Sequence, residues 1–372
     1  MLYKGNKEKT LSAELFKNPG SEYRGAPFWS WNCVLSEDEL LRQIEIFKEM
    51  GFGGYHMHVR SGMATRYLSE EFMHLIKSCV KKGEEIGLLP WLYDEDRWAS
   101  GQAGGYVTKN MKYRMKYIVF TPTKEEYVSY QEAIETGKPY LLSTYDVVLN
   151  SDGTLKSYKM IDADTEAEGI KVYAFVRHHF GGGWHNDQGY VDSMNDEAMA
   201  EFINITHEAY NREIGESFGK TVHAIFTDEP HFAGKEVLAF SHEPKALSLP
   251  WTYDFDETFN KMYGFSLIPR LPEVVWNLPD NKPSYVRYCY HDHTAERFAN
   301  AYAKQIGIWC EKHNISLTGH MLSEPLLKTQ TNSCGEVMRS LSHFGIPGID
   351  MLCDLREYTT AKQAQSVKNQ YG

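Results

Sequence analysis

Short apolar runs alternate with amphipathic segments along most of the chain. Six runs stand out, at residues 26–31, 53–59, 88–93, 222–226, 315–317 and 348–352. Between them, apolar side chains recur at helical spacing, as at Leu40, Ile44 and Phe47, and a glycine such as Gly51 or Gly87 ends the segment. This alternation predicts strand–helix units built around a parallel sheet.

A stretch of about eighty residues with a different pattern interrupts this repeat after the third run. Its apolar runs, at 117–120, 140–149, 157–161 and 172–176, have the length and composition of antiparallel strands. Asn150-Ser-Asp-Gly153, between two of them, is a hairpin-turn sequence. We therefore predict a β-rich insertion over residues 106–190. Asn195 is then placed to begin a helix that extends to about residue 214.

The fourth apolar run ends in two carboxylates. Asp228 and Glu229 follow it directly, and Pro230 stops the strand because it lacks a backbone N–H. Catalytic side chains of a (β/α)8 barrel lie at the C-terminal ends of its parallel strands. We therefore predict a TIM-barrel-type α/β fold for residues 1–372, with the insertion after its third strand. Because about six units are visible and a barrel needs about eight, we expect it to be incomplete, or completed by a partner chain or a second copy.

Polar and aromatic residues also mark the ends of the other runs. They are Trp29, Trp31 and Asn32 for the first run, His56 and His58 for the second, Asp94, Glu95 and Trp98 for the third, His320 and Glu324 for the fifth, and Asp350 for the sixth. Each alone has an ordinary explanation, such as a hydrogen-bonded core histidine or a buried indole ring. Together they suit a sugar, whose apolar face stacks on aromatic rings while its hydroxyls bind carboxylates. We expect this set to bind substrate.

Glycoside hydrolysis needs one protonated carboxyl group, to donate to the leaving oxygen, and one ionised carboxylate, to activate water or attack the sugar. Glu229 is the candidate general acid. Asp228 either raises the pKa of Glu229 by charge repulsion or turns inward to anchor the strand. Glu324 is the candidate second carboxylate, and Glu95 is the next choice.

Composition argues against several classes of partner. The 39 Lys and Arg residues against 50 Asp and Glu give a net charge of −11, with no basic face for nucleic acid. No apolar run has the length of a signal peptide or a membrane span, so we expect a cytoplasmic protein without a membrane partner. The six cysteines lack the spacing of a disulfide framework or a zinc site.

A series of motifs occurs in a characteristic order. It consists of Pro27-Phe-Trp-Ser-Trp-Asn32, Tyr93-Asp-Glu-Asp-Arg-Trp-Ala-Ser-Gly101 with Ala103-Gly-Gly105, Phe226-Thr-Asp-Glu-Pro230, Thr318-Gly-His320 and Pro347-Gly-Ile-Asp350. From about Arg24 onward the chain resembles glycoside hydrolase family 106, the α-L-rhamnosidases and their relatives. The resemblance implies an inverting glycosidase with a barrel catalytic domain, glutamates as acid and base, and a calcium ion that helps to hold the sugar. It also implies a further strand with another glutamate, and β-sandwich domains, beyond residue 372, so we expect a fragment.

Two other functions fit the same residues. His56, His58, His320 and Asp350 are similar to the zinc ligands of metal-dependent hydrolases, in which the ion activates water. The other is a non-catalytic, carbohydrate-binding barrel, degenerate or truncated, which would bind a sugar without turning it over. A tightly bound transition metal would favour the first alternative, and affinity without turnover the second.

Overall fold

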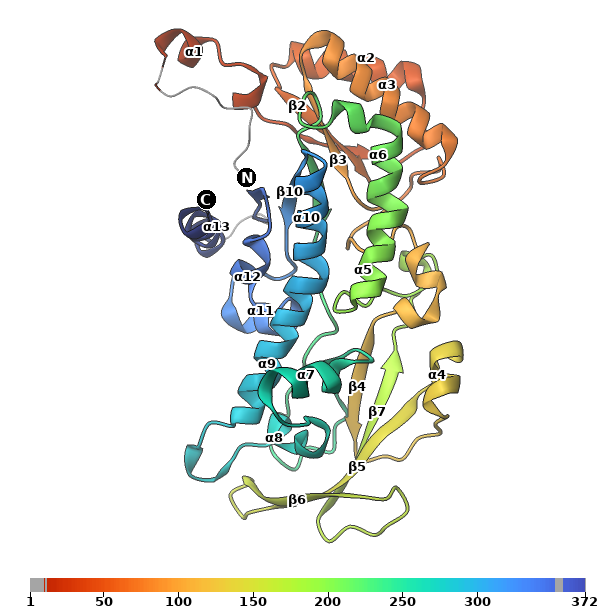
Figure 1. Ribbon diagram of the computed structural model, residues 1–372, viewed down its shortest axis with the longest axis vertical. Helices are drawn as coiled ribbons and strands as arrows, with labels where there is room; N and C mark the ends of the chain where they lie inside the picture. Colours follow the sequence, from red (N-terminus) through yellow and green to blue (C-terminus); the bar gives the residue numbers. More distant parts are fainter. Residues whose placement is uncertain (1–9, 11, 352–356, 372) are drawn as a thin grey trace.

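The computed structural model of the protein describes residues 10, 12–351 and 357–371. The molecule is elongated, with a parallel sheet towards one end, an antiparallel sheet towards the other, and a long helix running beside both (Figure 1). Buried hydrophobic side chains from both sheets form one contiguous cluster. The two sheets are therefore joined by a common core.

The parallel sheet has six strands in the order β1-β2-β3-β8-β10-β11. Their bounds are β1 Phe28–Trp31, β2 Gly54–Val59, β3 Leu89–Tyr93, β8 Ala224–Asp228, β10 Ser316–His320 and β11 Ile346–Pro347. All neighbours run parallel, and His320 at the end of β10 is paired with Asp228 at the end of β8. The carboxyl ends of these two strands therefore bring their terminal side chains together.

The prediction of a (β/α)8 barrel is wrong. Within the described residues, β1 and β11 each pair on one side only, so the six-stranded sheet stays open, and five further strands form a separate antiparallel sheet. Alternation of strands and helices predicts a parallel sheet covered by helices, but it does not determine whether that sheet closes. The sixth strand was expected at 348–352, but β11 lies just before that range, and residue 352 lies outside the described part.

Helices cover one face of the parallel sheet. Because successive side chains of a strand point to opposite faces, Trp29 and Trp31 of β1 lie on the helix side. Trp29 packs edge-on against Phe47 of α2 (Glu37–Glu49), and Trp31 packs against Phe72 of α3 (Glu70–Ile86). Phe28, one residue before Trp29, lies on the opposite face, where its ring contacts Phe226 of β8. That second face carries the candidate site.

The antiparallel sheet has the strand order β6-β5-β7-β4-β9. Its strands are β4 Lys116–Thr121, β5 Tyr140–Leu149, β6 Leu155–Ile161, β7 Ile170–His178 and β9 Leu247–Trp251. The first four correspond to the four strands predicted within 106–190. The fifth comes from a later part of the chain, where Pro250 makes the sequence unlike that of a central strand. It is tolerated because β9 is an edge strand.

The remaining helices connect and brace the sheets. They are α1 Ala13–Lys17, α4 Tyr130–Thr136, α5 Asp196–Phe202, α6 Glu208–Ile214, α7 Phe255–Tyr263, α8 Pro272–Val275, α9 Tyr285–Phe298, α10 Gln305–Lys312, α11 Leu327–Ser333, α12 Val337–Leu341 and α13 Thr359–Tyr371. Asn195 begins α5 as predicted, accepting the backbone N–H groups of Glu197 and Ala198. Among the described helices, none combines the length and apolar character needed to cross a bilayer.

A long helix formed by α9, a π-helical segment (Ala299–Lys304) and α10 contacts both ends of the molecule (Figure 1). The hydroxyl of Tyr290 donates to the carbonyl of Pro250 in β9 at 2.8 Å. In α10, Trp309 Nε1 donates to Glu208 Oε1 of α6 at 2.7 Å. The helix therefore holds the antiparallel sheet to the helical layer of the parallel sheet.

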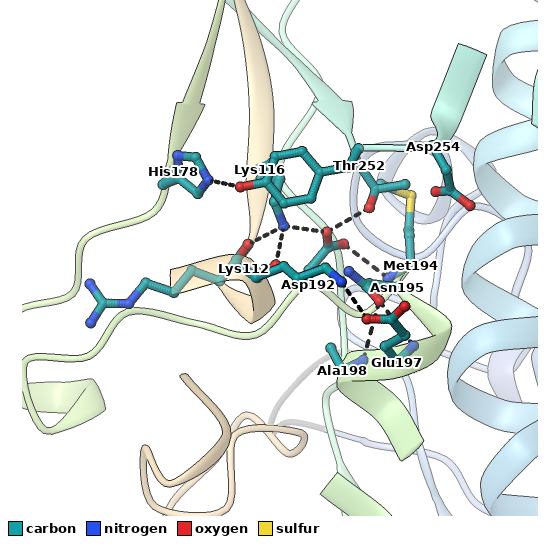
Figure 2. Close-up of polar contacts among 12 residues, drawn as sticks. Lys112, Lys116, His178, Asp192, Met194, Asn195, Glu197, Ala198, Thr252 and Asp254 are labelled. Carbon is teal, nitrogen blue, oxygen red and sulfur yellow. Dashed lines mark hydrogen bonds and ion pairs between the residues drawn. The ribbon is translucent and has the colours of Figure 1, made fainter. Parts of the chain in front are cut away.

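A buried ion pair joins β4 to the segment before α5 (Figure 2). Lys116 Nζ lies 2.8 Å from Asp192 Oδ2 and donates to the carbonyls of Lys112 and Arg114, and its side chain is completely buried. Thr252, directly after β9, donates to the same Asp192 oxygen at 2.7 Å. Three separate segments of the chain therefore meet at one carboxylate.

Candidate active site

Asp228, the last residue of β8, is the centre of a buried polar cluster. Its carboxylate accepts hydrogen bonds from Tyr93 Oη at 2.7 Å and from His320 Nε2 at 3.2 Å, and His58 Nε2 lies 3.7 Å away. Its backbone N–H donates to Ser100 Oγ. Side chains from β2, β3 and β10 thus converge on one carboxylate at the end of β8.

These contacts decide the ionisation of Asp228. Burial alone would raise the pKa of Asp228, but the hydrogen bonds from His320 and Tyr93 and the nearby imidazole of His58 outweigh it and hold that pKa well below its usual range. Asp228 therefore stays ionised. The contacts of Asp228 fit the predicted role of an inward anchor for the strand. In addition to burial, its negative charge raises the pKa of Glu229, which was the other predicted role.

Glu229 follows directly and points to a different environment. Its backbone has a φ of 48°, in the left-handed region that non-glycine side chains seldom adopt. The side chain is half-buried, and its pKa is raised by burial and by the charge of Asp228, with a contribution from Asp350. A raised pKa keeps a carboxyl group protonated nearer to neutral pH, as a general acid requires.

Glu324 and Asp350 complete the acidic groups of this region. Glu324 is 2% exposed, its Oε1 accepts the backbone N–H of Asp350 at 2.6 Å, and its Oε2 accepts that of Met321 at 3.3 Å. Burial raises the pKa of Glu324 to about 7. Asp350 is half-buried. Glu324 thus ties the segment after β11 to the end of β10 and has little contact with solvent.

Three side chains could together hold a cation. Ligand atoms of Glu229, His320 and Asp350 lie within 4.8 Å of one another, the only such group of His, Cys, Asp and Glu side chains found among the described residues. His56 and His58 do not belong to it. His58 is turned to Asp228 instead, so the three-histidine set considered for zinc is not assembled.

Aromatic rings cover the sheet face next to these groups. Phe28, which is 49% exposed, lies 5.0 Å from the ring of His56, and His56 lies 5.0 Å from Trp91. The pKa of His56 is lowered to about 4 by burial, so its ring is neutral at neutral pH. Phe28, Trp91 and Tyr93 were not among the predicted site residues. Alternation along β1 and β3 could have identified them, because every second residue of a strand points to the same face of the sheet.

The other predicted substrate-binding residues of the first strand lie away from the site. Trp31 is 1% and Trp29 7% exposed, and both rings pack under the helices, where no sugar reaches them. Their prediction as stacking platforms is wrong, because the alternation of β1 turns them to the opposite face from Phe28. Asn32 is exposed just after the strand.

Asp94 and Glu95 are fully buried and serve the backbone. Asp94 accepts a hydrogen bond from Ser100 Oγ. Glu95 accepts the backbone N–H groups of the following loop, those of Asp96, Gly101, Gln102, Ala103 and Gly104. Both carboxylates therefore hold the loop after β3, and Glu95 is not available as a second catalytic group. Trp98 is half-buried within this loop.

Comparison with known proteins gives information on the fold alone. No protein-family profile and no curated protein matches the sequence. The structure is similar to that of a rhamnosidase from Novosphingobium sp. PP1Y, with a TM-score of 0.61 and 13% sequence identity, over 96% of this chain and 52% of that one. The chain thus spans about half the length of that enzyme. The likeness establishes a fold shared with a glycosidase, and membership of family 106 stays a prediction.

Proposed function

We propose that this chain is the catalytic part of a glycoside hydrolase, acting on an α-L-rhamnoside or a related glycoside. The observation that carries the proposal is the pair Asp228–Glu229, in which adjacent carboxyl groups have pKa values moved in opposite directions. Such a separation assigns acid and base roles in many enzymes. The fold shared with a rhamnosidase and the series of motifs support the same conclusion.

In this proposal Glu229 is the general acid that protonates the leaving oxygen. Asp228 assists by keeping the proton on Glu229 through its charge and by fixing His320 beside it. The exposed ring of Phe28 offers an apolar surface to one face of the sugar, while Asp350 and Glu229 offer acceptors to its hydroxyls. All of these side chains lie on the face of the parallel sheet opposite α2 and α3.

The second carboxylate determines the stereochemical course. The motif resemblance implies inversion, which needs carboxyl groups about 6.5–9.5 Å apart, whereas retention needs about 5–5.5 Å. Asp350 has an oxygen within 4.8 Å of Glu229, which is too close for the base of an inverting reaction. We propose Glu324 as that base. Its two carboxylate oxygens accept hydrogen bonds from backbone N–H groups, and one of these bonds must break before an oxygen can accept a proton from water.

Calcium, which the resemblance implies, fits the acidic group near Glu229 poorly. Calcium takes about 6–8 oxygen ligands. The group formed by Glu229, His320 and Asp350 offers two carboxylates and an imidazole nitrogen. No step of the proposed mechanism depends on calcium.

The first test is hydrolysis of an α-L-rhamnosyl disaccharide, whose sugar leaving group needs protonation, by the chain and its Glu229→Gln variant. Loss of proton donation lowers the rate about 10²–10⁴-fold. Glu257→Gln, on the exposed side of α7, is the matched control and keeps full activity. Equal rates for the Glu229 variant and the wild type would contradict the assignment, and sugar binding without turnover in the wild type would favour the non-catalytic alternative.

Proton NMR of the first sugar product tests the stereochemical assignment. Inversion is expected, with product of the opposite anomeric configuration to the substrate appearing before mutarotation. Retention would instead point to Asp350 as the nucleophile, since its oxygen, within 4.8 Å of Glu229, is nearer to the retaining than to the inverting spacing. In that case Asp350→Asn would abolish turnover.

A further inference from the structure

One ring nitrogen of His320 forms a hydrogen bond, and the other has no partner among the described residues. Its Nε2 donates to Asp228 Oδ1 at 3.2 Å, while its Nδ1 is buried and has no hydrogen-bond partner among the described residues. The whole side chain is 6% exposed. Leaving a buried polar atom unsatisfied is costly, so such an atom calls for a ligand or another explanation.

The surroundings of His320 resemble those of a metal-binding histidine. Histidines that coordinate a metal commonly donate their other N–H to a carboxylate, which fixes the ring and raises its basicity. Asp228 has this position towards His320, and Tyr93 Oη and Ser100 Oγ hold Asp228 in turn. The support for the imidazole is therefore built from β3, the loop after it, and β8.

Two carboxylates lie within reach of the same ion. An oxygen of Glu229, an oxygen of Asp350 and a ring nitrogen of His320 lie within 4.8 Å of one another, close enough for one ion to be shared among them. Imidazole nitrogen and carboxylate oxygen are both ligands of zinc and related transition metals, and three protein ligands leave a further position for water. Calcium and magnesium prefer sites made of oxygen alone.

We propose that Glu229, His320 and Asp350 form a binding site for a divalent transition-metal ion such as Zn²⁺, and that the bound ion inhibits the hydrolase. Metal binding itself stands on the geometry, whereas inhibition rests on the proposed function. When the ion binds, Glu229 and His320 each release to solvent any proton held on the atom that coordinates the metal, and the oxygen of Glu229 becomes a ligand. That oxygen can then no longer donate to a glycosidic bond, and Asp350 no longer contacts the sugar.

The binding test uses chelator-treated protein titrated with Co²⁺, which acquires visible absorption on nitrogen and carboxylate ligation, followed by displacement with Zn²⁺. One ion is expected per chain, with Zn²⁺ bound more tightly than Ca²⁺. His320→Gln and Asp350→Asn abolish the Co²⁺ absorption, and Asp228→Asn weakens affinity about 10–100-fold because the His320 ring loses its carboxylate partner. His74→Gln is the matched control, because His74 lies beside Glu37 on the surface and its loss leaves binding unchanged.

Thermal unfolding of each variant without metal shows whether its fold is intact, and two independent ligand variants guard against the failure of one. Absence of Co²⁺ absorption in the wild type, or its persistence in both ligand variants, overturns the site. In the glycosidase assay, Zn²⁺ is expected to inhibit and Ca²⁺ to have no effect. Metal binding without any glycosidase activity would overturn the proposed function but leave the site standing, and stimulation by Zn²⁺ would overturn the inhibitory role.

Discussion

Neighbouring carboxyl groups at the candidate site differ because their contacts differ. Asp228 accepts hydrogen bonds from Tyr93 and His320 and stays ionised, whereas Glu229, one residue on, is half-buried beside that fixed charge. The chain turns sharply between them, with Glu229 in the left-handed region. Two identical functional groups thereby acquire opposite ionisation behaviour, which composition or spacing alone does not predict.

Glu324 provides a prediction about stability and pH. Its folded-state pKa is about 7, above its ordinary value of 4.5, so the protonated form stabilises the fold and this contribution is lost as pH rises through about 7. Glu324→Gln removes that dependence. Urea unfolding at pH 5 and pH 8 should show the wild type losing about 2–3 kcal/mol more than the variant over this range. The same loss in both proteins would mean that Glu324 titrates normally.

Lys116 gives a prediction for the antiparallel sheet. Burial lowers the pKa of its ammonium, and Asp192 offsets only part of that shift, while two backbone carbonyls accept hydrogen bonds from the same ammonium (Figure 2). Lys116→Met leaves Asp192 buried without its counter-charge, and the free energy of unfolding falls by about 3–5 kcal/mol. Lys112→Met, which breaks the exposed pair with Glu197, costs about 0–1 kcal/mol. Similar losses in the two variants, measured by urea unfolding, would contradict the importance given to burial.

The predicted elements succeed where a local pattern decides them. The first five strands of the parallel sheet, the first four of the antiparallel sheet, and the helix begun by Asn195 lie close to their predicted positions. Strand β9 was not predicted because Pro250 makes its sequence unlike that of a strand, although an edge strand tolerates proline. The prediction of a closed sheet was wrong because no local pattern determines closure. In the same way, the pattern of β1 shows that Trp29 and Trp31 share one face, but it does not show whether helices cover that face.

Side-chain partners set a second limit on prediction from sequence. Glu95 is as acidic and as close to a strand end as Glu229, yet its oxygens accept the N–H groups of its own loop. His58 and His320 both face Asp228, which unites residues from three strands distant in the sequence. Residue type and strand position therefore identified the region of the site, while the roles within it required the fold.

The whole molecule raises the question of whether two sheets with different topology unfold as one. Their buried side chains form a single cluster, and the helix from Tyr285 to Lys312 contacts both ends (Figure 1). We therefore expect one cooperative unit, in which Lys116→Met lowers the hydrogen-exchange protection of amides in β7 and in β8 by the same free energy. Native-state exchange followed by mass spectrometry measures both segments. A loss confined to β7, with β8 unchanged, would show that the antiparallel sheet opens independently and that the shared core does not couple the sheets.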